Sequence, residues 1–235
     1  MKRFYKDVAI APGQGGQAIR LDGRAVRTPA RAELVLPSAA LADAVAAEWR
    51  EQGDRIEPRS MPMTGLANAA IDHVAPDPSR FTATLATYAE TDLLCYRAES
   101  PPTLVAREAA EWDPLLAWAR GRYDVAFEIA TGIVHRPQPP ATLARLEAAV
   151  AALDPFRLAA LSPLVTITGS LVLALALVED AITPDAAWTA AQVDEDWQAE
   201  RWGEDPLAAA ARANRRREFD AGVRFLAATG DTRSP

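Results

Sequence analysis

The acidic stretch VDEDWQAERWGEDP, from Val193 to Pro206, is the densest set of possible catalytic side chains in the sequence. Its fourteen residues include six acids, two tryptophans and one arginine. Two carboxyls can serve as the acid and the base of a hydrolase when a substrate cleft separates their pKa values. The sequence shows no cleft, so a carboxylate-dependent hydrolase using acids within residues 194–205 is kept as the alternative function.

The same stretch has the spacing of a helix, which is expected to begin at the capping pair Thr183-Pro184 and to end at Gly203. At 100° per residue, two opposite stripes each combine tryptophan with acids. One stripe consists of Ala186, Ala190, Val193, Trp197, Glu200 and Glu204, and the other of Trp188, Glu195 and Trp202. Tryptophans on two faces indicate either a recognition surface or a helix buried on both sides, and the pattern leaves both open.

Other chemical motifs lack the context that they need. GQGGQA, from Gly13 to Ala18, matches a dinucleotide fingerprint but leads into a hairpin, whereas a pyrophosphate needs a helix N-terminus. His73 and His135 are the only histidines, and neither has a second ligand at zinc spacing. Cys95 lies in the apolar run LLCY and is expected to be an inert core thiol. No metal, cofactor or catalytic residue is therefore expected.

The charge balance disfavours nucleic acid as a partner. The 235 residues carry a formal net charge of -7, whereas binding to phosphates depends on an excess of Lys and Arg. The basic run Arg215 to Arg217 is followed by Glu218 and is interpreted as a solvated helix face.

One segment is long enough to cross a bilayer, because residues 158–178 contain no charge. Pro163, Gly169 and several hydroxyl side chains dilute it, so we expect a single long helix buried inside a helical domain and no membrane insertion. The first residues, MKRFYKDVAIAPG, contain neither an apolar leader nor a transit-peptide pattern, and a cytoplasmic location is expected.

The periodicity changes along the chain and predicts an α+β fold. RFYKDVAIA, QAIRL, AVRTP and AELVL alternate as strands of a small antiparallel sheet, with a turn at Asp22-Gly23. From Ser38, a possible cap, the apolar residues recur at helical spacing. Short helices follow within residues 63–74 and 79–88, and LLCYRA is expected to be one more strand.

Pro101-Pro102 marks the predicted boundary between a β-rich N-terminal domain with short helices, residues 1–100, and a helical C-terminal domain, residues 101–235. Pairs of a capping residue and proline predict helix starts at Asp154-Pro155, Thr183-Pro184 and Asp205-Pro206. VAFEIATGIVH is the exception, and it fits either a pair of short strands or loops.

Several blocks of the sequence, in order and spacing, resemble the family of chaperones that assemble the catalytic head of the rotary ATP synthase, known from mitochondria and alpha-proteobacteria. These blocks are LDGRAVRTPA (21–30), LPSAALADAVAAEW (36–49), MPMTGLANAAID (61–72), YAETDLLCYRA (88–98), EWDPLL (111–116), LSPLVTITGSLVLALAL (161–177) and VDEDWQAERWGED (193–205). The resemblance implies a small β-rich domain followed by a larger helical one, and neither catalysis nor a cofactor.

The resemblance also implies a partner. Members of this family bind the unassembled alpha subunit, without ATP, and protect the surface that a beta subunit later covers. Carried over position by position, it makes Trp49, Glu195, Glu200 and Glu204 the expected partner contacts, although Trp49 shares a helix stripe with Leu41 and fits core packing as well. With the two tryptophans of the acidic stretch, the expected partner-binding set is Trp49, Glu195, Trp197, Glu200, Trp202 and Glu204. A monomer is expected.

Overall fold

The computed structural model describes residues 1–203 and 205–230, and the contacts of these residues divide into two compact units. The first unit contains residues 1–78 and 154–160 and the described residues from Ala221 onward. The second contains residues 79–153 and 161–220. The domain boundary expected after residue 100 refers to parts that fold independently. Contacts within the folded chain do not test this, so the boundary stays a prediction.

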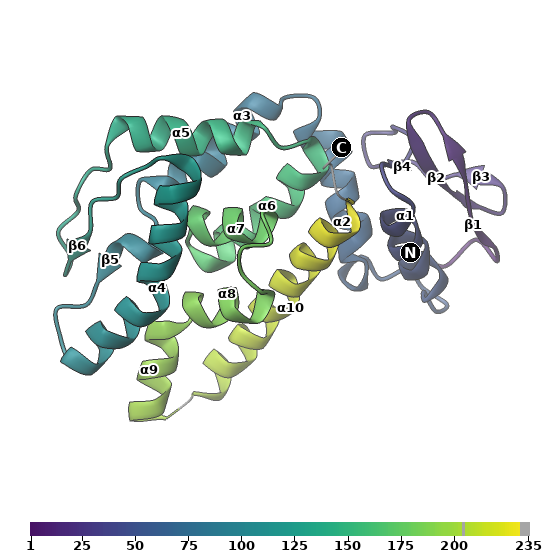
Figure 1. Ribbon diagram of the computed structural model, residues 1–235. Coiled ribbons are helices and arrows are strands. Elements are labelled where there is room, and N and C mark those ends of the chain that lie inside the picture. Colours follow the sequence, from purple (N-terminus) through teal and green to yellow (C-terminus); the bar gives the residue numbers. More distant parts are fainter. Residues whose placement is uncertain (204, 231–235) are drawn as a thin grey trace. The chain divides into compact units, whose positions relative to one another are not determined.

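A small antiparallel sheet forms the β part of the first unit (Figure 1). Its strands are β1 (Val8–Gly13), β2 (Gly16–Leu21), β3 (Arg24–Ala25) and β4 (Val35–Leu36), with β2 paired to the other three. The Gly-rich motif is the β1–β2 hairpin connection, as predicted, and Gly15 has the positive φ of 81° that glycine adopts without strain. Asp22 and Gly23 make the next turn, also with positive φ.

Helices α1 (Ala39–Arg50) and α2 (Pro62–Ala69) accompany this sheet, and α2 continues as a π-helical turn, Ala70–Val74. Ser38 caps α1 as expected, because its hydroxyl accepts a hydrogen bond from the Leu41 amide at 3.0 Å. The core of the unit joins Ile19 and Leu36 of the sheet to Leu41 and Val45 of α1, and Phe225 packs against them. The α+β prediction is therefore confirmed.

The second unit consists mainly of helices, with one short parallel strand pair (Figure 1). The pair is β5 (Tyr96–Arg97) with β6 (Ala130–Thr131), so VAFEIATGIVH contributes one short strand followed by a loop. The helices are α3 (Pro78–Ala86), α4 (Pro102–Tyr123), α5 (Pro140–Ala151), α7 (Leu171–Val178), α8 (Pro184–Ala191) and α9 (Val193–Trp202). Helices α6 (Pro155–Thr168) and α10 (Pro206–Ala228) contribute residues to both units.

Two helices expected to be continuous are broken. The apolar segment is not one long helix but α6 followed by α7, because Gly169 has a φ of 67° and the Ser170 hydroxyl caps α7 through the Leu173 amide. The acidic helix is likewise divided at Gln192, whose φ of -112° and ψ of 10° end α8. The helical stripes drawn through residues 186–204 therefore do not lie on one helix.

Across the described residues, no helix is both long and apolar enough to cross a membrane. Helix α7 is buried along most of its length, which explains why this part of the chain has no charged side chain.

Candidate partner-binding site

Helix α9 carries most of the acidic stretch, and the chain on either side of it fixes its ends. Val193, its first residue, is buried, and Gly203 ends it with a φ of 84°. Asp205 then caps α10, since its carboxylate accepts a hydrogen bond from the Ala208 amide at 3.1 Å. As predicted, Asp205 has a structural partner. Glu204 lies outside the described residues.

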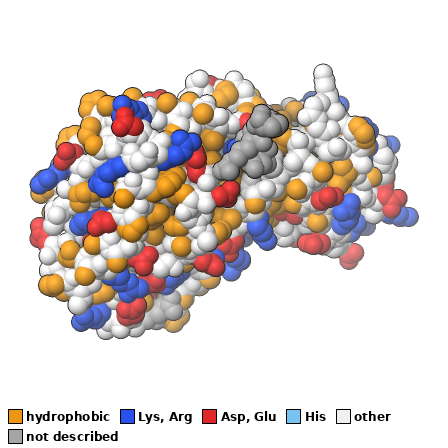
Figure 2. All heavy atoms as spheres, in the orientation of Figure 1, with side chains coloured by type: hydrophobic (Ala, Val, Ile, Leu, Met, Phe, Trp, Pro, Cys, Tyr) orange, Lys and Arg blue, Asp and Glu red, His pale blue; other side chains and the backbone are white. Residues whose placement is uncertain are grey.

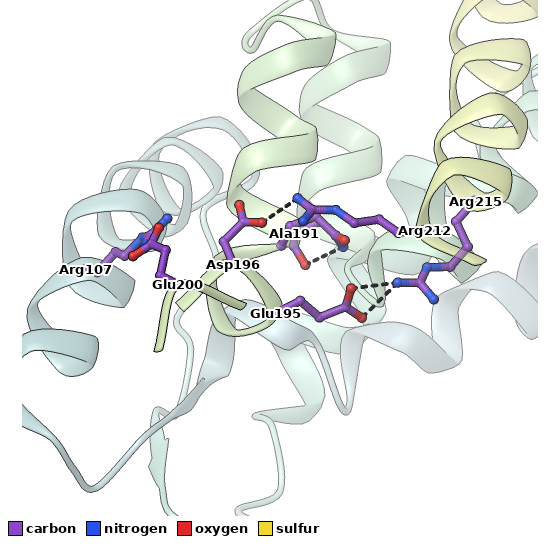
Figure 3. A network of polar contacts seen from close by, with 8 residues as sticks. Arg107, Ala191, Glu195, Asp196, Glu200, Arg212 and Arg215 are labelled. Carbon is purple, nitrogen blue, oxygen red and sulfur yellow. Dashed lines mark hydrogen bonds and ion pairs between the residues drawn. The ribbon is translucent and has the colours of Figure 1, made fainter. Parts of the chain in front are cut away.

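The acids of α9 are paired with arginines of neighbouring helices (Figure 3). Both carboxylate oxygens of Glu195 accept hydrogen bonds from Arg215 Nη2 of α10, at 2.9 and 2.7 Å. Asp196 pairs with Arg212 of α10, and Glu200 pairs with Arg107 of α4 at 2.8 Å. The three carboxylates therefore reach toward different arginines on two other helices.

The tryptophans of the two predicted stripes have separate surroundings. Trp188, on α8, is buried against Phe219 and under the guanidinium of Arg216, so it is a core residue. Trp197 is partly buried, and the Arg201 guanidinium lies 5.0 Å from the centre of its ring. Trp202 is 74% exposed at the end of α9 and meets Trp197 edge to face.

A pocket of ≈ 330 Å³ lies between the end of α9 and the start of α10. Its lining combines the Trp202 ring with the Glu195–Arg215 ion pair and with Arg212. Leu207, close to Trp202 in the chain, is 80% exposed. We call Trp202, Leu207 and this pocket the α9–α10 face. It offers a large apolar contact area beside charges that are already paired, which suits the recognition of a protein surface.

Trp49 is placed in the first unit and not at the α9–α10 face. It is partly buried, and its ring lies edge to face with Tyr5, whose hydroxyl donates a 2.6 Å hydrogen bond to the Trp49 carbonyl. Its indole Nε1 is buried without an acceptor. Trp49 therefore packs partly into the core, as one of the two predictions had it. Its role in partner binding stays a prediction.

One pair of carboxyls does converge, but it is enclosed. Glu108 of α4 is 1% exposed and accepts the Ala98 amide, while Oδ1 of Asp194 is buried with no donor. The pKa of Glu108 is raised to about 7, mainly by burial and also by the adjacent Asp194, while the hydrogen bond from the Ala98 amide opposes the rise. A proton on Glu108 would satisfy the Asp194 oxygen. Because Glu108 is buried, the pair is suited to fastening α9 to α4.

Cys95 is buried, and burial raises the pKa of its thiol to about 12, which confirms an inert core thiol.

Within residues 1–203 and 205–230, no cluster of three potential metal ligands is present. Acidic and basic side chains alternate over the face drawn in Figure 2.

The arginine partners were missed by the sequence analysis. The run Arg215 to Arg217 is not only a solvated face, because Arg215 holds Glu195, and Arg216 pairs with Asp185 and Asp220. The sequence did contain a signal for the pairs with Arg212 and Arg215. An acidic helix and a basic helix joined by the short turn at Gly203 are expected to pack side by side and to form ion pairs. Arg107, which is far away in sequence, gave no such signal.

Comparisons with known proteins identify relatives of this chain. Residues 2–120 match the model of a protein family described as ATP12 chaperone protein. The protein of the fission yeast Schizosaccharomyces pombe named "Protein atp12, mitochondrial" is 24% identical over 214 residues, which are 86% of this chain and 74% of that protein.

Two solved bacterial structures have the same fold. The crystal structure of Atp12 from Paracoccus denitrificans is 43% identical, covers 97% of this chain and 98% of its own, and has a TM-score of 0.93. The Atu1473 protein from Agrobacterium tumefaciens is 42% identical, covers 97% of this chain and 86% of its own, and has a TM-score of 0.93.

Proposed function

Because this chain belongs to the ATP12 chaperone family, we propose that it is an ATP-independent assembly chaperone of the ATP synthase. Its client is the unassembled alpha subunit of the catalytic head, which it binds on the surface that a beta subunit later covers. A subunit surface that is buried in the finished assembly is apolar and prone to aggregate while it is exposed, so a protein that covers it has a clear physical benefit.

The α9–α10 face is the observation that carries the proposed contact. Trp202 supplies a large exposed ring, and aromatic anchors contribute much of the energy at protein interfaces. The ion pairs of Glu195 and Glu200 hold α9 against α10 and α4, so the ring is presented from a fixed helix. Basic groups of the client could exchange with Arg107 or Arg215, which would orient the client more than it would raise affinity.

The proposal has three further parts. The chaperone acts in the bacterial cytoplasm as a monomer, and it uses neither a cofactor nor a catalytic step. The geometry of the acids supports this, because Glu195, Asp196 and Glu200 each reach toward a different arginine. A hydrolase would need two of them to converge on one substrate.

Capture of the alpha subunit tests the proposal. The immobilised chaperone should retain purified alpha subunit at a stoichiometry of one to one, and free beta subunit should displace it. Trp202→Ala should weaken capture by about tenfold or more, because the exposed anchor is lost. The control is Leu143→Ala, which truncates a partly buried side chain on α5 and should leave capture unchanged.

Two outcomes of the capture experiment would contradict different parts of the proposal. If the folded wild-type protein retains no alpha subunit, or retains beta subunit equally well, the assignment of the client is wrong. If alpha is captured but Trp202→Ala and Leu143→Ala behave alike, the client is right and the α9–α10 face is wrong.

A further inference from the structure

The N-terminal sheet is a basic region in an acidic protein. Residues 1–31 contain seven Lys and Arg and two Asp, a formal charge of +5, whereas the whole chain has a charge of -7. Asp22 offsets part of this charge, since its carboxylate accepts hydrogen bonds from the backbone amides of Lys6 and Asp7 and interacts with the charge of Arg24. The sheet therefore presents positive charge that attracts acidic groups.

A pocket of ≈ 670 Å³ opens within this basic region. Its lining combines apolar and aromatic side chains with two guanidinium groups and one carboxylate. The aromatic side chains are Phe4, Tyr5 and Trp49, and the charged ones are Arg24, Arg27 and Asp22. This volume lies in the range of pockets that hold a ligand or a few side chains of a partner.

The aromatic wall of the pocket is fixed in place. Phe4 and Tyr5 meet edge to face at 5.4 Å, and Tyr5 and Trp49 do so at 5.6 Å. The 2.6 Å hydrogen bond from the Tyr5 hydroxyl to the Trp49 carbonyl fastens the middle ring to the end of α1. Phe4 is nevertheless 64% exposed, which leaves a large apolar surface in contact with water.

The two guanidinium groups of the pocket differ in their present contacts. Among the interactions of the described residues, no hydrogen bond or ion pair within 4 Å engages the Arg24 guanidinium, although the Asp22 carboxylate lies near enough to interact with its charge. Arg27 donates a hydrogen bond to the carbonyl of Arg31. A partner that brings carboxylates would pair with both groups.

We propose that this pocket is a second docking site, which binds an acidic segment of the client polypeptide through an apolar side chain packed against the wall of Phe4, Tyr5 and Trp49 and through carboxylates paired with Arg24 and Arg27. The proposal rests on the proposed function, because it assigns the segment to the same client. Arginine suits this role, since its planar fork binds carboxylates at two points.

A polypeptide fits the pocket better than a polyanion does. The aromatic wall needs an apolar group next to the negative charge, and a glutamate or aspartate beside a leucine or phenylalanine supplies both. A nucleic acid duplex would contact the cations through its phosphates and leave Phe4 exposed, and the acidic remainder of the chain would repel any nucleic acid.

Client capture by charge-reversal variants is the main test. Arg24→Glu combined with Arg27→Glu should weaken capture of the alpha subunit at least about fivefold, and more at low salt than at high salt. The control, Arg20→Glu combined with Arg31→Glu, makes the same charge change in the same N-terminal region outside the pocket lining. Phe4→Ser, at an exposed site, should weaken capture without affecting folding.

A direct probe separates this inference from the proposed function. A fluorescent peptide of alternating glutamate and leucine should bind the wild type, measured by anisotropy, and should not bind the Arg24/Arg27 double variant. A peptide of alternating lysine and leucine should not bind either. If the wild type binds the acidic peptide but not the alpha subunit, the pocket stands as an acidic-peptide site and the identity of the client fails.

Three results would overturn the inference while leaving the proposed function intact. In the first, both double variants capture the alpha subunit equally well. In the second, the lysine peptide binds as tightly as the glutamate peptide. In the third, only phosphatidylglycerol vesicles lose binding when Arg24 and Arg27 are reversed, which would assign the cations to a lipid surface.

Discussion

Acidic side chains of this protein are held in two different ways, in the core of each unit and on helix α9. In the core, the carboxylate of Glu48 accepts hydrogen bonds from the Met63 and Thr64 amides, at 2.7 and 2.8 Å, at the start of α2. Asp92 accepts the Val172 amide at 3.0 Å, at the start of α7. On α9, by contrast, Glu195 and Glu200 are more than half exposed and are bound by arginine side chains.

The difference shows that a high density of acids is a poor guide to which acids matter for folding. Single buried carboxyls satisfy backbone amides at helix N-termini, where the helix dipole also favours negative charge. Removing one of them leaves donors unpaired in the core. Exposed carboxylates can exchange an arginine partner for water, or for a client, at little cost in stability.

The largest effect is expected from Asp92→Ala. The amides of Val172 and Leu94 would lose their acceptor inside the core, so the free energy of unfolding should fall by about 4 kcal/mol. Urea-induced unfolding followed by circular dichroism measures the change. Asp92→Asn keeps one acceptor oxygen and should cost less. Equal loss from both variants would show that the charge and not the hydrogen bonds is important.

A somewhat smaller effect is expected from Glu48→Ala. It removes the acceptor of the Met63 and Thr64 amides, and unfolding free energy should fall by about 3 kcal/mol. Glu51→Ala, at an exposed site three residues later, is the control and should change stability very little. Similar values for the two variants would mean that the α2 amides find another partner.

The pH dependence of stability should depend on Glu108, whose pKa rises from 4.5 to about 7 on folding. Between these values the folded protein holds a proton that the unfolded chain has lost, so stability falls as the pH rises. The Glu108 contribution is complete below pH 4.5 and is lost by about pH 7, with a total of about 3 kcal/mol.

Glu108→Gln cannot titrate, so the difference in unfolding free energy between wild type and variant should change across this pH range and stay constant above it. Denaturation series at several pH values measure the difference. A difference that stays constant from acid to neutral pH would show that Glu108 does not hold the proton.

The smallest effect on stability is expected on α9. Glu200→Gln combined with Glu204→Gln breaks the exposed pair with Arg107 and should change unfolding free energy by less than about 1 kcal/mol. Capture of the alpha subunit should nevertheless slow or weaken severalfold. Glu128→Gln combined with Glu147→Gln, at two exposed sites, is the control for the charge change. If the double variant does not fold, these acids are structural and not contacts.

Local signals predicted most of the elements. Alternation and the Asp22-Gly23 turn gave the antiparallel sheet, and the capping residues Ser38, Thr183 and Asp205 gave three helix starts that the structure confirms. These features depend on residues within a few positions of one another, so the sequence contains their whole cause. The breaks at Gly169 and Gln192 were missed because a single backbone angle ends each helix while the apolar pattern continues.

The sequence by itself determined the α+β class, the helix caps and, through its matching blocks, the chaperone family. Tertiary structure alone decided which acid meets which partner, because Arg107 and Glu200, or Glu108 and Asp194, are brought together only by helix packing. It also decided that Trp188 is buried while Trp202 is exposed. Spacing along one helix cannot fix this, since burial depends on the neighbouring helices that cover each face.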